Sequence, residues 1–212
     1  MLATIPTMIT VGIDEVGRGC WAGPLVAGAV ILPENAALTF IWEDCPPKGQ
    51  NTKAREVRLV DSKKLSKGQR ETSAEWIHAN AVATGLGWVW PTEIDMHGLT
   101  WAVKTAMERA LAEITLKYDE IIIDGNINYF AHNSKARAII KADDSVPAVS
   151  AASIVAKVAR DRYMTELDEQ YSGYGFAKHV GYGTAAHSSA LKMLGVSDIH
   201  RQSYKPIQAF LV

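Results

Sequence analysis

The sequence predicts one α/β domain with a mixed central sheet, helices on both faces of that sheet and a small helical part toward the C-terminal end. Short apolar runs of strand length come early in the chain, separated by polar or glycine-rich links. Stretches with helical spacing of apolar residues and further short strands then alternate. This order is typical of a sheet that joins antiparallel and parallel neighbours and is covered by helices.

The first half of the chain supplies three of the expected strands. Apolar runs over 8–13 and 24–32 predict two strands, and the short link between them favours antiparallel pairing. The proline-punctuated, charged segment 33–58 predicts a long loop or insertion. A helix is expected over 66–82, behind a serine in the capping position, and a third strand over 83–90.

The second half alternates between helix and strand. We expect a turn at Pro91, because proline and threonine follow the third strand there. Apolar residues at helical spacing and short aliphatic runs predict helices over 98–117, 148–170 and 184–194 and strands over 120–124 and 137–142. Residues from about 165 to 212 would then form the helical C-terminal part of a single domain spanning 1–212.

The bulk composition is that of a globular protein. Hydrophobic residues make up 48% of the 212 positions, and no apolar run is long enough to span a bilayer. The first residues lack the basic segment and cleavage site of a secretory signal, so we expect a cytoplasmic location. Cys20 and Cys45 lack the spacing of a zinc site or a disulfide framework, which predicts free thiols. A net charge of −1 neither indicates nor excludes nucleic-acid binding.

Acidic residues follow three of the predicted strands. Asp14 and Glu15 follow the first, Asp124 ends a later one, and Asp143 and Asp144 follow the last. Acids at the carboxyl ends of buried strands repel one another, and Mg²⁺ or Mn²⁺ relieves that conflict because both ions prefer oxygen ligands. Two such ions about 4 Å apart can activate a water and stabilise the leaving oxygen in phosphodiester cleavage.

Ordinary turn chemistry is the alternative interpretation of these acids. An aspartate after a strand is commonly a turn former or a helix cap, and for any one of these residues that role is the commoner. Turn chemistry does not require acid at three separate strand ends, so the alternative is weaker for the set.

Nine segments in fixed order then identify a family. They are DEVGRG (14–19), AGPLVAGAVIL (22–32), DSKKLS (61–66), EID (93–95), AMERA (106–110), IIIDGN (121–126), KADDSVPAVSAASIVAKVARD (141–161), YGFAKHVGYGTAAH (174–187) and HRQSY (200–204). Each resembles a motif of ribonuclease HII, and together they run from about residue 10 to about residue 206. The resemblance implies the RNase H-like fold.

The resemblance also implies an activity. Such an enzyme hydrolyses the RNA strand of RNA–DNA hybrids and incises duplex DNA on the 5′ side of embedded ribonucleotides. It uses two metal ions, Mg²⁺ or Mn²⁺, and leaves 3′-hydroxyl and 5′-phosphate ends. The family's catalytic and metal-binding acids correspond to Asp14, Glu15, Asp124 and Asp143. The family usually has Lys-Gly-Asp at the last position, and spacing here favours Asp143, with Asp144 as a neighbour that could share its role.

Further residues correspond to substrate contacts of the family. The segment Gly17, Arg18 and Gly19 would sense the 2′-hydroxyl of the ribonucleotide, which distinguishes RNA from DNA. Tyr182 would pack on the neighbouring sugar, and the expected phosphate contacts include Lys63 and Lys157. A plain tight turn, a tyrosine that anchors a loop and solvated lysines are the alternatives. His179 is assigned no role.

This chain also departs from the family's pattern. Cys20 stands where the family usually has proline, and Trp21 replaces a small or aliphatic residue. Both follow the glycine-flanked arginine and leave the stiffness of that loop open. Segment 33–58 is longer than is common in bacterial members, and its role is not indicated.

Two other functions are compatible with parts of this pattern. A ribonuclease HIII-like enzyme would prefer longer RNA tracts and carry an additional N-terminal domain, whereas here the first acid is residue 14. A non-catalytic hybrid-binding protein would not need all four acids. The expected partner is nucleic acid rather than a membrane, and we expect a monomer. The final QAFLV (208–212) resembles a sliding-clamp peptide, but packing is the commoner role for such a tail.

Overall fold

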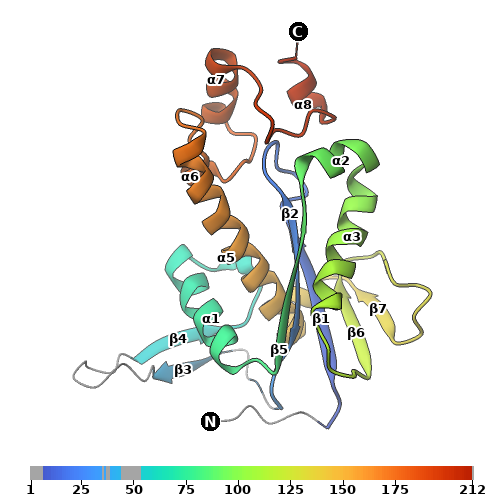
Figure 1. Cartoon of the computed structure of the whole chain (residues 1–212). Helices are drawn as coiled ribbons and strands as arrows, with labels where there is room; N and C mark the ends of the chain where they lie inside the picture. Colours follow the sequence, from blue (N-terminus) through green and yellow to red (C-terminus); the bar gives the residue numbers. More distant parts are fainter. Residues whose placement is uncertain (1–6, 35, 37–38, 44–53, 212) are drawn as a thin grey trace.

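A five-stranded mixed sheet forms the centre of the molecule. The computed structural model describes residues 7–34, 36, 39–43 and 54–211 (Figure 1). The strands lie in the order β5-β2-β1-β6-β7. Their bounds are β1 (Thr10–Val16), β2 (Leu25–Ile31), β5 (Ala83–Val89), β6 (Glu120–Asp124) and β7 (Ala136–Ile139). The β1–β2 and β2–β5 pairs are antiparallel, whereas β6 lies parallel to β1 and to β7, so the predicted mixed sheet is confirmed.

Helices cover both faces of this sheet, as predicted. On one face α3 (Leu99–Ala112) packs on β1, β2 and β5, and on the other α5 (Pro147–Gln170) packs on β1 and β2, with α1 (Lys67–Asn80) beside it. Glycines allow the close approach. A Cβ at Gly28 would overlap the backbone of Ala152 on α5, and one at Gly87 would overlap that of Ala106 on α3.

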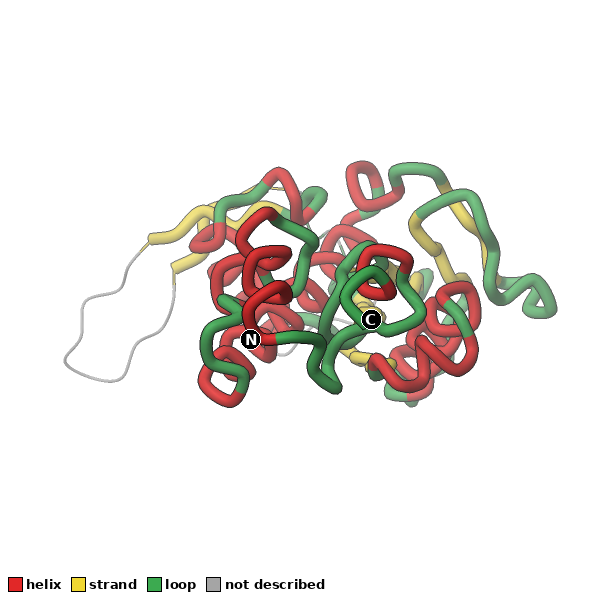
Figure 2. Tube along the Cα trace, turned by 90° about the horizontal axis from the view of Figure 1, so that it is seen from above, coloured by secondary structure: helices red, strands yellow, loops and turns green. Residues whose placement is uncertain are grey.

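The prediction of a loop over 33–58 is wrong in part. The segment contains an antiparallel hairpin of β3 (Thr39–Glu43) and β4 (Ala54–Arg58), while 44–53 lie outside the described residues. Val57 is buried in the cluster that includes α1, and the Arg58 amide donates to Ser73 of that helix at 3.1 Å. The hairpin lies at the opposite end of the molecule from β7 (Figures 1 and 2). Prolines and charges around these strands mask their apolar positions in the sequence.

Further element boundaries differ from the prediction, and the helix expected over 98–117 ends already at Ala112. The predicted turn at Pro91 is the start of α2 (Pro91–His97), since proline fits the first helical position, and Gly98 (φ 82°) separates α2 from α3. The strand expected over 137–142 ends at Ile139, and the short helix α4 (Ala142–Ser145) follows. Asp143 therefore lies in a helical turn rather than directly at a strand end.

The C-terminal part is helical, as predicted. Figure 1 shows α7 (Ala185–Leu194) and α8 (Lys205–Gln208) together at the upper end of the sheet, near α6 (Phe176–His179). A separate apolar cluster joins these helices to the end of α5, and Phe210 packs against it. No helix in the described part of the chain is long and apolar enough to cross a bilayer.

Candidate active site

Two neighbouring parallel strands bring Asp14 and Asp124 to the same end of the sheet. The register pairs Ile13 with Ile123, so the two acids occupy the next position on adjacent strands. Side chains alternate between the faces of a sheet, and both isoleucines pack in the α3 cluster, which leaves the acids on the α5 face. Asp14 is buried there, and the Ser153 hydroxyl of α5 acts to lower its pKa.

The short helix α4 brings Asp143 to the same place. Its first amides point at Asp124, whose carboxylate accepts from the Ala142 amide at 2.8 Å and from the Asp143 amide at 3.5 Å. Asp144 turns away and forms an exposed ion pair with Lys64 at 2.6 Å. The two adjacent aspartates thus have different surroundings, one buried near Asp124 and one partly exposed beside a lysine.

Burial and mutual repulsion act on three of these acids. Burial raises the pKa of Asp14 well above its usual range, and the charges of Glu15 and Asp124 raise it further. Burial also raises the pKa of Glu15, although Arg18 opposes this through a hydrogen bond of 3.0 Å. The pKa of Asp143 rises to about 6, through burial and then the charges of Asp124 and Asp61. Asp124 is the common electrostatic neighbour of the other three.

Lys63 is a cation close to this group. Burial alone would lower its pKa, but the charges of Asp61, Asp14 and Asp143 outweigh burial and raise it. Asp61, 3.7 Å from the Lys63 ammonium, was not predicted as a site residue, nor was Ser153. The DSKKLS motif contains Asp61, but the aspartate follows no clear apolar strand, and a serine inside a helix carries no distinctive signal.

The donor set fits a hard divalent cation. All the acids offer oxygen, and they outnumber the nearby cations Lys63 and Arg18, which leaves a surplus of negative charge. Among the residues that the structure describes, no three His, Cys, Asp or Glu side chains converge closely enough to enclose an ion. An open arrangement suits Mg²⁺, which usually keeps several waters and binds through one or two carboxylates.

A pocket of about 180 Å³ adjoins the acids, and all of the predicted substrate-binding residues line it. Ser62 and Ser153 also line it, and Ser153 connects it to buried Asp14. Residues 17–19 form the GRG loop at its edge. Gly17 has φ 94°, which favours glycine, whereas a Cβ on Gly19 would meet no atom within 4 Å. The Gly19 backbone is therefore open to a ligand.

Tyr182 forms the other side of the pocket. It lies in the tyrosine turn, defined here as residues 181–183, and its side chain is 39% exposed. The Lys157 ammonium lies 5.8 Å from the centre of its ring, within the range of a cation–π contact, and also pairs with Asp161 at 2.7 Å.

The two residues that depart from the family's pattern pack between the loops. Cys20 is buried and pairs with Tyr182 as an isolated β-bridge. Trp21 lies against Gly183, where a Cβ would overlap the indole, and 5.5 Å from the His187 ring. His179, for which no role was predicted, is buried and accepts from the Gly181 amide at 3.2 Å. These residues connect the GRG loop region to the tyrosine turn.

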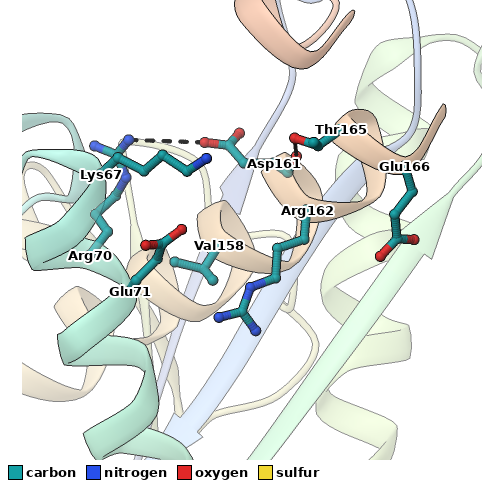
Figure 3. Close-up of a pocket in the computed structure, with 8 residues that line it drawn as sticks. All are labelled: Lys67, Arg70, Glu71, Val158, Asp161, Arg162, Thr165 and Glu166. Carbon is teal, nitrogen blue, oxygen red and sulfur yellow. Dashed lines mark hydrogen bonds and ion pairs between the residues drawn. The ribbon is translucent and has the colours of Figure 1, made fainter. Parts of the chain in front are cut away.

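A basic groove extends from the pocket between α1 and α5. One cavity of about 410 Å³ shares Lys157 and Tyr182 with the pocket, and another of about 200 Å³ continues beyond it. Figure 3 shows Arg70 on α1 facing Asp161 on α5, 4.0 Å apart. The groove is lined by the cations Lys67, Arg70, Lys157, Arg162 and Lys178, which outnumber the acids Glu71, Asp161 and Glu166.

Comparisons with known proteins agree on one family. A family model described as ribonuclease HII matches residues 11–207. A ribonuclease HII from Nitratidesulfovibrio vulgaris is 42% identical, over 98% of this chain and 90% of that protein. One from Nitrosococcus oceani is 44% identical, over 94% of this chain and 90% of that protein.

Solved structures give the same result for the fold. The ribonuclease H2 of Pyrococcus horikoshii superposes with a TM-score of 0.72 at 25% identity, covering 96% of this chain and 97% of that one. A PCNA:RNase HII complex from Archaeoglobus fulgidus gives 0.68 at 28% identity, with 93% and 96% covered. Bst-RNase HIII in complex with Mn²⁺ gives 0.64 at 18% identity, over 98% of this chain and 70% of that one, and supports the fold alone.

Proposed function

Because this chain belongs to the ribonuclease HII family and is an RNase H endonuclease, we propose that it incises nucleic acid 5′ of ribonucleotides with the four acids identified above. The substrates would be the RNA strand of RNA–DNA hybrids and single ribonucleotides embedded in duplex DNA. The observation that carries the proposal is the geometry of the acids: Asp14 and Asp124 follow paired positions on adjacent parallel strands, and Asp124 accepts from the amide of Asp143 at 3.5 Å.

The acids would hold the metal ions on which the family depends. Asp14, Glu15, Asp124 and Asp143 supply oxygen ligands, and two bound Mg²⁺ or Mn²⁺ ions would activate a water and stabilise the leaving 3′ oxygen. Asp124 is kept in place by the Ala142 amide, which fixes the carboxylate without neutralising it. We assign Asp143 rather than Asp144 as the metal ligand, because Asp144 already forms an ion pair with Lys64.

The pocket beside the acids would hold the ribonucleotide. The open Gly19 backbone allows close approach to the 2′-hydroxyl, and the Tyr182 ring offers a face to the adjacent sugar. Arg18 is half exposed and pairs with Glu15, so it links recognition of the ribose to the metal-binding acids. Lys63 and Lys157 line the same pocket and would contact phosphates.

A sliding-clamp contact has weaker support in this chain. The relative from Archaeoglobus fulgidus was solved with PCNA. Here Phe210 packs against the C-terminal apolar cluster, which favours a packing role for that residue.

The test is cleavage of a labelled duplex with one ribonucleotide, in Mg²⁺ and separately in Mn²⁺, with products mapped at nucleotide resolution. We expect a single cut 5′ of the ribonucleotide, and no cut in the matched all-DNA duplex. Asp124→Asn should abolish the cut while leaving the circular dichroism spectrum unchanged. Absence of incision by the wild-type protein at every metal concentration would overturn the substrate assignment, and an active Asp124→Asn variant would overturn the site.

A further inference from the structure

Two fully buried arginines lie between the GRG loop and the tyrosine turn. Arg160 on α5 and Arg201 before α8 are both 0% exposed. Within the described part of the chain, neither forms an ion pair with a carboxylate. A buried charge without a counter-ion opposes folding unless its hydrogen bonds are well satisfied. Their partners therefore indicate what these side chains do.

Arg160 connects the two sides of the pocket through backbone carbonyls. Its guanidinium donates to Ala22 at 3.1 Å and to Pro24 at 2.8 Å, both in the segment that follows the GRG loop. It also donates to Val180 at 2.8 Å, just before the tyrosine turn. The side chain lies directly behind Gly17, where a Cβ would meet its Nε atom. One rigid planar group thus fixes the spacing between the two loops.

Arg201 holds the GRG loop itself. It donates twice to the Gly23 carbonyl, at 3.0 and 2.9 Å, and once to the Arg18 carbonyl at 3.1 Å. The Tyr204 hydroxyl accepts from Arg201 at 3.0 Å and donates to the same Arg18 carbonyl at 2.7 Å. Arg18 is the central residue of the loop, so its carbonyl is held from two directions.

From these contacts we infer that Arg160, Arg201 and Tyr204 are positioning residues for discrimination of the ribose. They hold the GRG loop and the tyrosine turn at a fixed separation, so that the loop backbone meets a 2′-hydroxyl while Tyr182 meets the neighbouring sugar. The planar fork of arginine suits this role, because it directs several donors at carbonyls in set directions, which lysine does not. The inference rests on the proposed function of the pocket.

Tyr204→Phe is the mildest test, because it removes one hydroxyl and leaves the ring. The matched control is Tyr171→Phe, which removes a hydroxyl that donates to Asp198 at 2.7 Å, in the same C-terminal part but away from both loops. Arg201→Lys and Arg160→Lys form the stronger arm, used where circular dichroism shows that they fold. The measurement is the affinity for two duplexes that differ in a single 2′-hydroxyl, in Ca²⁺, with the duplexes checked afterwards for intactness.

The readout is the ratio of the two affinities. A variant that is only partly folded lowers both affinities equally and leaves the ratio unchanged. We expect Tyr204→Phe to lower the wild-type ratio about threefold to tenfold, the range of one lost hydrogen bond. Affinity for the all-DNA duplex should stay within about twofold. The lysine variants should lower the ratio further, and Tyr171→Phe should retain it.

Two different failures can be told apart. If the wild-type protein shows no preference for the ribonucleotide, the proposed function of the pocket is wrong. If the wild-type preference is present and Tyr204→Phe keeps it, or loses affinity for both duplexes alike, the three residues do not position the pocket for the ribose.

Discussion

At the scale of single residues, the adjacent aspartates Asp143 and Asp144 lie in different surroundings. Asp143 is 6% exposed, and its pKa is raised by burial and by Asp124. The hydrogen bond from Lys64 lowers the pKa of Asp144, which lies at the surface. A residue with an unsatisfied negative charge in a buried site suits a metal ligand, whereas one already paired with lysine does not.

This contrast predicts different effects for two matched substitutions. Asp143→Asn should lower kcat for incision at a single ribonucleotide by at least about a hundredfold. The substitution removes a negatively charged ligand of the metal ions that would stabilise the transition state. Asp144→Asn should keep activity within a few-fold of the wild type. The measurement is steady-state cleavage at saturating Mg²⁺. Equal losses in both variants would show that the neighbouring aspartates share the site.

The same acid also predicts the pH dependence of metal-free stability. Asp143 has a folded pKa of about 6 against an ordinary value of 3.8, so its contribution to stability is present below about pH 4 and is lost as pH rises through 6. Asp143→Asn removes this pH-dependent loss of stability, because asparagine does not ionise. We expect the variant to gain on the order of 2 kcal/mol in unfolding free energy at pH 7.5, and far less at pH 4.

Urea unfolding in EDTA at the two pH values measures this gain. Added Mg²⁺ should stabilise the wild type more than the variant, because the ion offsets the repulsion that the substitution removes. A variant less stable than the wild type at pH 7.5 without metal would show that repulsion at Asp143 is not the dominant effect.

At this scale the four acids could be predicted from their positions after apolar runs and from the family motifs. Asp61 and Ser153 could not, because their relation to Asp14 and Asp143 depends on how α5 and the segment before α1 pack together. The proximity of Arg160 and Arg201 to the GRG loop has the same origin. They follow Arg18 by more than 140 residues, and only the folded chain brings them together.

At the scale of elements, the tyrosine turn packs closely against Trp21, because Gly183 has no side chain and leaves room for the indole. Trp21 fills the space that Gly183 leaves, and the turn holds Tyr182 at the pocket. The sequence leaves the effect of Trp21 open. The structure shows the large side chain packed against a glycine of the facing loop.

This packing predicts a compensating pair. Gly183→Ala alone should destabilise the fold by about 1–3 kcal/mol, because its Cβ overlaps the indole. Trp21→Ala alone should also destabilise, by loss of buried area. In the double variant the clash between the new Cβ and the indole is absent. Its loss in free energy of unfolding should therefore be smaller than the sum of the losses of the two single variants. Chemical denaturation of all four proteins measures the coupling, and strict additivity would contradict the contact.

Elements were predicted well where apolar periodicity was strong and less well where it was interrupted. The strands β1, β2, β5 and β6 lie close to their predicted positions, as do α1, α5 and α7. The β3–β4 hairpin was missed because prolines and charges surround its apolar positions in the sequence; among the hairpin side chains whose burial the structure describes, Val57 is the buried one. The helix α2 was missed because proline marks both a turn and a first helical position.

At the scale of the whole molecule, charge is distributed unevenly despite a net charge of −1. Asp14, Glu15 and Asp124 lie toward the carboxyl ends of β1 and β6, with Asp143 on α4 near Asp124, and the cations outnumber the acids along the groove between α1 and α5. The sequence predicted the mixed sheet and hence the meeting of the acids. It did not predict the groove, because its lysines and arginines come from three separate helices.

The groove predicts how binding depends on salt. A duplex strand that leaves the pocket past Tyr182 would meet Lys178 and Lys67, which are exposed. Each phosphate contact that is lost should reduce the slope of log affinity against log salt by about 0.9. We therefore expect Lys67→Ala and Lys178→Ala each to flatten the slope by that amount, and the double variant by about twice as much.

Lys104→Ala provides the matched control, because Lys104 lies on α3, on the opposite face of the sheet, and is similarly exposed. Its slope should equal that of the wild type. Binding is measured by fluorescence anisotropy in Ca²⁺ with a duplex long enough to span the groove and with one truncated at the pocket. If the groove carries the flanking strand, the lysine variants change the slope only for the long duplex. An equal change for both duplexes would place these contacts at the pocket, and no change for either would remove the groove from the binding surface.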